Sequence, residues 1–86
     1  MTSAQDPLAV GRIVHGEVAS HHPWGIELEL EEVDAYGTVD LRFLSDDPAD
    51  MNESRFPSLG KRLVAKVQGM TPDGQLRLTI RESDLS

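Results

Sequence analysis

The alternation of apolar and polar residues is the feature that most constrains the fold of this chain. In residues 75–81, QLRLTIR, every second side chain is apolar. A β-strand points successive side chains to opposite faces, so this run predicts a strand with one aliphatic face. We expect Arg77, Thr79 and Arg81 to point outward. The Asp73-Gly74 pair just before it predicts a tight turn from the preceding strand.

Four earlier runs show the same pattern, at residues 11–20, 22–32, 36–41 and 61–70. Together with the last run they predict a protein of five short strands. Gly16, inside the first run, predicts a bulge or a sharp bend. We expect the strands to turn these side chains inward: Val14, Gly16, Val18, Ile26, Leu28, Leu30, Val39, Leu41, Leu63, Ala65 and Val67.

Residues 45–60 break the alternation. Asp47 followed by Pro48 is typical of a helix cap with proline at the first helical position, and Phe56-Pro57 marks its end. The expected fold is therefore all-β, a five-stranded OB-fold barrel with a short helical insert between strands 3 and 4. We expect a flexible leader at residues 1–9, the OB-fold domain at 10–82 and a flexible tail at 83–86.

Composition limits the possible functions. The 86 residues contain no cysteine, which excludes disulfides and cysteine-based zinc sites. No apolar run has the length of a membrane span, and the first residues lack the features of a signal peptide, so we expect a soluble cytoplasmic protein without a membrane partner. No nucleophile elbow or phosphate-binding glycine loop is present, so we expect no enzyme activity, no cofactor and no small-molecule substrate.

His21-His22 is a candidate metal-binding pair. Adjacent side chains of an extended segment point to opposite sides, and no third ligand has suitable spacing. We therefore expect no metal site.

Five pieces of the sequence, in order and spacing, resemble the S1 RNA-binding domain family. They are LAVGRIVHGEV, PWGIELEL, YGTVDLRFLSDD, PSLGKRLVAKVQGM and DGQLRLTIRE, and the similarity covers roughly residues 8–82. The resemblance implies an OB fold of S1 type and a function in RNA binding. It places Trp24-Gly25 at the family's aromatic-glycine pair in strand two, Gly37 and Val39 at the strand-three pair, and Leu59-Gly60 before strand four.

The sequence departs from the family pattern where RNA would bind. Glu27 replaces a second aromatic residue, and Asp40 replaces the strand-three histidine. A carboxylate gives a base nothing to stack on and repels phosphates. The net charge of −7 also disfavours nucleic acid unless basic residues cluster on one face.

Two functions remain open at this stage. The first is weak, salt-dependent binding of single-stranded RNA. Its candidate contact residues are aromatic or basic: Trp24, Arg42, Lys61, Arg62, Lys66, Arg77 and Arg81. The second is binding of a basic protein partner by a module that has lost RNA binding. The alternative contact residues are Trp24, Glu27, Glu29 and Asp40. For Trp24 itself, capping of the barrel and stacking on a ligand are both possible.

Overall fold

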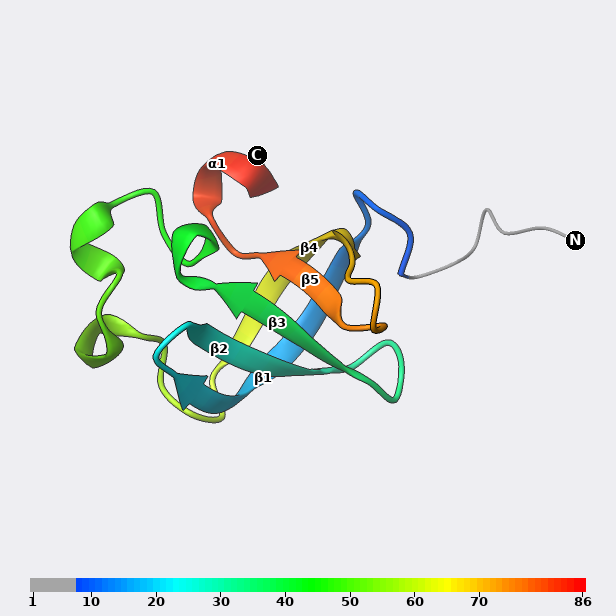
Figure 1. The fold of residues 1–86 in the computed structure, drawn as a ribbon, viewed down its shortest axis with the longest axis horizontal. Coiled ribbons are helices and arrows are strands. Elements are labelled where there is room, and N and C mark those ends of the chain that lie inside the picture. The colour runs from blue at the N-terminus through cyan, green and yellow to red at the C-terminus, as the bar shows by residue number, and fades with distance from the viewer. Residues whose placement is uncertain (1–7) are drawn as a thin grey trace, which may run out of the picture.

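The computed structural model describes residues 8–86, and these form a closed barrel of five strands. The strands are β1 (Ile13–His22), β2 (Gly25–Leu30), β3 (Tyr36–Asp40), β4 (Arg62–Met70) and β5 (Leu76–Thr79). Their order around the barrel is β1-β2-β3-β5-β4, and β4 pairs with β1 to close it (Figure 1). All neighbours are antiparallel except β3 and β5, which are parallel. The predicted five-stranded barrel is confirmed.

The barrel core follows the predicted alternation. The buried strand residues include Val14, Val18, Ile26, Leu28, Val39, Ala65, Val67, Leu76 and Leu78. Leu44 and Phe56, from the segment between β3 and β4, join this core. Figure 1 shows that this segment leaves the barrel at one end.

The segment between β3 and β4 contains three short 3-10 helices, at Leu41–Phe43, Pro48–Asp50 and Glu53–Arg55. In the second of them, Asp47 is the N-cap and its side chain accepts a hydrogen bond from the backbone N–H of Ala49. Pro48 comes directly after this cap, as the sequence pattern indicated. Proline is suited to this position because its missing N–H has no intrahelical partner there.

Two glycines allow β2 to approach its neighbours closely. At Gly25 the φ angle is +146°, and a Cβ atom would lie 2.0 Å from the carbonyl oxygen of Val39. At Gly16 a Cβ would lie 2.8 Å from the carbonyl oxygen of Glu29. The predicted bulge is not at Gly16: the register of β1 shifts between Val18 and Ser20. Gly16 instead provides the space for this close approach.

Three local predictions were wrong. β1 continues through His21 and His22 and ends only before Pro23. Leu41 belongs to a 3-10 helix and is only partly buried against the core. Thr79 is buried rather than outward, and its hydroxyl is satisfied by a 2.7 Å hydrogen bond that it donates to Asp84 Oδ2.

The end of the chain contacts the barrel. Residues Glu82–Leu85 form the helix α1, in the stretch expected to be a flexible tail. Lys66 donates a 2.9 Å hydrogen bond from Nζ to the carbonyl oxygen of Asp84. The expected leader at residues 1–9 lies mostly outside the described residues. Within residues 8–86, no helix is long and apolar enough to cross a membrane.

Candidate functional site

The outer side of β2, β3 and β5 carries a row of polar side chains. Ser20 on β1 pairs with Glu27, Glu27 pairs with Thr38, and Thr38 pairs with Arg77. Asp40 lies two residues beyond Thr38 on β3, opposite Gly25. Glu27 and Asp40 therefore occupy diagonal positions on the same outer wall, as the sequence predicted. We call this surface the β2–β3–β5 wall.

One end of this wall is hollowed. The hollow has a volume of about 200 Å³. It is lined by Trp24 from the β1–β2 turn, Thr38 and Asp40 from β3, Thr71 and Gln75 from the β4–β5 turn, and Arg77 from β5. Three segments that are distant in sequence thus meet because β3 pairs with β5. The hollow brings together an aromatic ring, a carboxylate, a guanidinium, two hydroxyls and an amide.

Trp24 is an exposed side chain of this hollow and not a cap of the barrel. Its side chain remains 43% exposed. Its ring stacks on His22, with ring centroids 4.6 Å apart and planes inclined by 4°. His22 is held in turn by Ser20, whose Oγ lies 2.8 Å from Nε2 and donates a 3.3 Å hydrogen bond to Glu27 Oε1. The stack fixes the orientation of the Trp24 ring without burying it.

Asp40 is held by the residues that follow it. Its Oδ1 accepts hydrogen bonds from the backbone N of Arg42 at 3.0 Å and from Nε of Arg42 at 3.1 Å. Partial burial raises the pKa of Asp40, but these bonds and the charges of Arg42 and Arg77 outweigh burial and lower the pKa below its usual value. Asp40 is therefore a carboxylate at neutral pH.

Arg77 differs from several of the other candidate cations. Among residues 8–86, no carboxylate lies within ion-pair distance of its guanidinium. Arg81 instead binds Asp84 through two nitrogens, at 2.8 and 3.1 Å, and approaches Asp46 at 3.8 Å. β5 ends at Thr79, so Arg81 lies beyond the sheet and pairs with Asp84 of α1 and not with the acids of the β2–β3–β5 wall.

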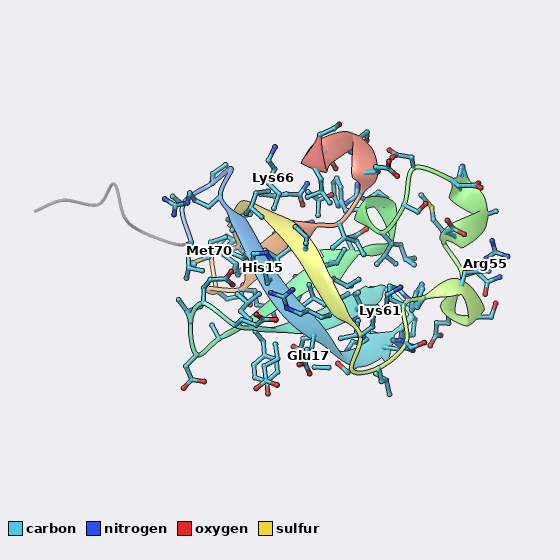
Figure 2. All side chains as sticks on the ribbon, turned by 180° about the vertical axis from the view of Figure 1, so that it is seen from behind. His15, Glu17, Arg55, Lys61, Lys66 and Met70 are labelled. Carbon is cyan, nitrogen blue, oxygen red and sulfur yellow. The ribbon has the colours of Figure 1, made fainter. Side chains whose placement is uncertain are left out.

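The densest basic group of the sequence lies away from the hollow. Lys61 precedes β4, and Arg62 and Lys66 are outward positions of β4. Figure 2 shows Lys61 and Lys66 from behind, on the side formed by β1 and β4, together with His15 and Glu17. Arg62 is neutralised there by Glu31, with contacts of 2.5 and 3.1 Å. We call this surface the β1–β4 wall.

The two adjacent histidines point to different parts of the molecule, as expected of neighbours in a strand. His21 donates from Nε2 to the carbonyl oxygen of Pro57 at 2.7 Å and contacts the edge of Phe56. His22 stacks on Trp24. Among the described residues, no three potential metal ligands come together.

Comparisons with known proteins place this geometry in a structural class. No family model matches the sequence, and no curated protein matches it significantly. A chain of the a/eIF2alpha–aDim2p–rRNA complex from Pyrococcus horikoshii is similar, with a TM-score of 0.74, 26% identity and 84% of this chain covered. The intact alpha subunit of aIF2 from Pyrococcus abyssi is similar with a TM-score of 0.72 and 26% identity, over 84% of this chain. GSP13 from Bacillus subtilis is similar with a TM-score of 0.73 and 22% identity, over 90% of this chain.

The chain has the fold of an S1-like OB-fold domain. It spans 44%, 28% and 58% of the lengths of these three chains. In OB folds the face of strands 2 and 3 and the loops after strands 1 and 4 form the usual oligonucleotide surface. The hollow of this S1-like domain lies between those two loops. Whether Glu27 and Asp40 replace ligand-binding residues of other S1 domains stays a prediction.

Three lining residues of the S1-like domain were missed from the sequence: Thr38, Thr71 and Gln75. Thr71 lies in the turn that the Asp73-Gly74 pair predicted correctly, but the sequence did not indicate that this turn borders the site. Its hydroxyl accepts from the backbone N of Gln75 at 2.9 Å and donates to Asp73, which keeps the turn ordered. Only the parallel pairing of β3 with β5 brings this turn beside Thr38, and no local pattern in the sequence specifies that pairing.

Proposed function

We propose that this S1-like domain binds short single-stranded RNA in the hollow of its β2–β3–β5 wall. The observation that carries the proposal is that exposed Trp24 and Arg77, which has no ion pair within residues 8–86, meet in one hollow between the β1–β2 and β4–β5 turns. An aromatic platform beside a cation is the combination by which proteins hold single strands, through base stacking and phosphate contact.

Trp24 supplies the stacking surface. One side of its ring is covered by His22, so a base would stack on the remaining exposed part. Stacking of a base on an aromatic side chain contributes about 1–3 kcal/mol. Because Ser20 and His22 already hold the ring, little side-chain freedom is lost when a base arrives.

Arg77 supplies the phosphate contact from the hollow, and Arg42, which bonds to Asp40 but does not line the hollow, is a second cation near it. The side chain of Arg42 is 66% exposed even though it pairs with Asp40. We leave Lys61, Arg62, Lys66 and Arg81 out of the contact surface, since they lie on the β1–β4 wall or are paired with Asp84. With so few cations available and a net charge of −7, we expect weak, salt-dependent affinity.

The structural relatives support an RNA ligand. The complex from Pyrococcus horikoshii, which includes a chain similar to this one at 26% identity, contains rRNA. We propose binding without catalysis, since the six lining residues include a single carboxylate and no cysteine, serine, lysine or histidine.

Replacement of Trp24 tests the proposal directly. In titrations of a labelled single-stranded RNA at low salt, we expect Trp24→Ala to lower affinity at least about fivefold while the protein stays folded, as judged by circular dichroism. Trp24→Phe should lose less RNA affinity than Trp24→Ala, because phenylalanine keeps an aromatic ring. Tyr36→Ala is the matched control, because Tyr36 is exposed on β3 but does not line the hollow. Unchanged affinity in Trp24→Ala would place any RNA elsewhere.

A basic protein partner is the second candidate. The observation that favours it is the direct pairing of Glu17 with Glu29 across β1 and β2, beside exposed Tyr36 on β3. Like charges at such positions are unfavourable unless a cation offsets them. On this proposal the partner would contact Glu27, Glu29 and Asp40 with Trp24 as anchor. The double variant Glu27→Gln/Glu29→Gln would then abolish partner binding, whereas RNA affinity would rise slightly on the first proposal.

A further inference from the structure

Asp40 has no evident role in holding a phosphate, and its position in the hollow needs another explanation. A carboxylate repels the backbone of a nucleic acid, yet Asp40 lines the same hollow as Trp24 and Arg77. The inference below rests on the proposed function, because it concerns which base would occupy that hollow.

The two oxygens of Asp40 are used unequally. Both hydrogen bonds from Arg42 go to Oδ1. Among residues 8–86, no donor is placed within hydrogen-bond distance of Oδ2. An ionised carboxylate is only an acceptor and has about four acceptor positions, so the two on Oδ2 remain free of donors from these residues. The hollow therefore offers a fixed, negatively charged acceptor next to an aromatic platform.

The pairing edges of the four RNA bases differ in how they meet such an acceptor. Guanine presents two neighbouring donors, N1–H and the N2 amino group. Adenine and cytosine present a single amino donor beside a ring-nitrogen acceptor, and uracil presents one N–H between two carbonyl oxygens. A carboxylate facing adenine, cytosine or uracil would thus meet an acceptor as well as a donor, and the acceptor repels it. Guanine alone gives it two donors.

Donors for the rest of the guanine edge lie in the same hollow. Next to N1–H, guanine carries O6, which is an acceptor, and arginine commonly donates to O6 and N7. Arg77 lines the hollow without an ion pair among the described residues, and its charge acts on Asp40. Gln75 adds an amide from the β4–β5 turn, which Thr71 holds in place. The hollow thus places one hydrogen-bond acceptor, Asp40, and two side-chain donors, Arg77 and Gln75, around the Trp24 ring.

We propose that the hollow selects a guanine base, which stacks on Trp24, donates from N1 and N2 to Asp40 and accepts at O6 from Arg77. The guanidinium of Arg77 has five N–H donors, so its remaining N–H groups can still hold the neighbouring phosphate. The rest of the strand contributes phosphate contacts that do not depend on sequence. The domain would then bind single strands that offer an unpaired guanine, and prefer them to strands of the other three bases.

The test uses heptamers of uridine in which the central position is guanosine, inosine, adenosine, cytidine or uridine. Inosine matches guanosine except that it lacks the N2 amino group. We expect the guanosine strand to bind about five- to tenfold more tightly than the adenosine, cytidine and uridine strands, with inosine between. Equal affinity for all five strands would overturn the guanine proposal and leave RNA binding intact. No saturable binding to any of them at low salt would overturn both.

Asp40→Asn is the decisive variant. Asparagine is as good an N-cap as aspartate, so its side-chain oxygen can still accept from the backbone N of Arg42 and keep the 3-10 turn. Removal of the charge should raise affinity for the uridine strand and reduce the ratio of guanosine to uridine affinity to below about twofold. Asp34→Asn, which removes a charge from an exposed position outside the hollow, should leave the ratio unchanged. A preserved ratio in Asp40→Asn would contradict the proposal.

Guanine also occurs in free nucleotides, so a competition arm separates the two sources. We expect guanosine monophosphate to displace the guanosine heptamer only at concentrations at least about tenfold above the heptamer's own dissociation constant, because it lacks the neighbouring phosphates. Displacement at an equal concentration would mean that a mononucleotide is the ligand and that the strand-binding part of the proposal is wrong.

Discussion

Arg77 shows how the environment of a single side chain decides its role. Arg62 and Arg81 have the same guanidinium group, but each is bound to a carboxylate through two nitrogens. A ligand phosphate would have to compete with those partners. Arg77 has no such partner among residues 8–86 and lies beside Trp24. Sequence alone ranks these arginines equally, because pairing depends on contacts between distant residues.

Arg77→Gln should therefore reduce RNA affinity and its dependence on salt. The slope of log K against log [salt] is negative, and loss of one phosphate contact makes it shallower by about 0.7 for a single strand. Lys61→Gln is the control, because Lys61 is exposed and lies on the β1–β4 wall. Titrations at several salt concentrations measure both slopes. A larger effect from Lys61→Gln than from Arg77→Gln would move the contact surface to the other wall.

The sequence did not predict the burial of Thr79 or the exposure of Trp24. The burial of Thr79 was missed because the alternation of residues 75–81 suggests one more outward position. The strand ends at Thr79, and Asp84 satisfies its hydroxyl from a helix five residues later. For Trp24, the sequence left exposure and capping equally open. Leu44 and Phe56 join the core from the segment between β3 and β4, and Trp24 stays exposed.

Among the structural elements, the β1–β2 hairpin positions the platform of the hollow. Trp24 lies in its turn, and the backbone N of Leu41 donates to the carbonyl oxygen of Trp24 at 2.8 Å. Gly25 follows immediately and packs its α-carbon against β3. The strand ranges of this hairpin were predicted to within a few residues from alternation. The close approach at Gly25 was not, because it depends on the register of β2 against β3.

Gly25→Ala should unfold or strongly destabilise the domain. The added Cβ would need both a disfavoured positive φ and a shift of Val39 away from its present position. We expect the free energy of unfolding to fall by about 3 kcal/mol or more, in the range of the most disruptive substitutions.

Gly60→Ala is the matched control for Gly25→Ala. Gly60 also has a positive φ, +83°, but nothing lies within 4 Å of its added Cβ. The backbone conformation alone should cost about 1–2 kcal/mol there. Urea unfolding of both variants measures the difference. Equal losses would show that the contact with Val39 is not what requires glycine.

On the scale of the whole molecule, the parallel pairing of β3 with β5 and the antiparallel pairing of β1 with β4 close the barrel and separate two walls. The resemblance to S1 domains implied this closed fold, and it is confirmed. Alternation alone predicts strands but not their order, so the distribution of charge between the walls could not be derived from it. The strand order places the densest basic group of the sequence, Lys61, Arg62 and Lys66, on the β1–β4 wall, away from the hollow.

The charge network also predicts how stability depends on pH. Hydrogen bonds and charges lower the pKa of Glu31, Glu32, Asp40 and Asp84. A carboxyl whose pKa is lower in the folded state binds protons more readily when unfolded. Its stabilisation is therefore complete above the ordinary carboxyl pKa of about 4 and is lost as pH falls further.

We accordingly expect the free energy of unfolding to fall as pH decreases from about 5 to about 2. Asp84→Asn should show a smaller fall, because the bonds that Asp84 accepts from Arg81 and Thr79 lower the pKa of Asp84. Urea titrations across this pH range provide the measurement. Stability that increases on acidification would contradict the assigned pairs.

The measurement that tests the central claim most directly is a titration of the isotopically labelled domain with a guanosine-containing uridine heptamer at low salt, followed by NMR chemical shifts. We predict that the largest shifts occur at the residues lining the hollow, including the Trp24 indole N–H and the backbone amides of Thr38, Asp40, Gln75 and Arg77. Shifts centred instead on His15, Glu17 and Lys66, or no shifts at all, would contradict RNA binding in the hollow.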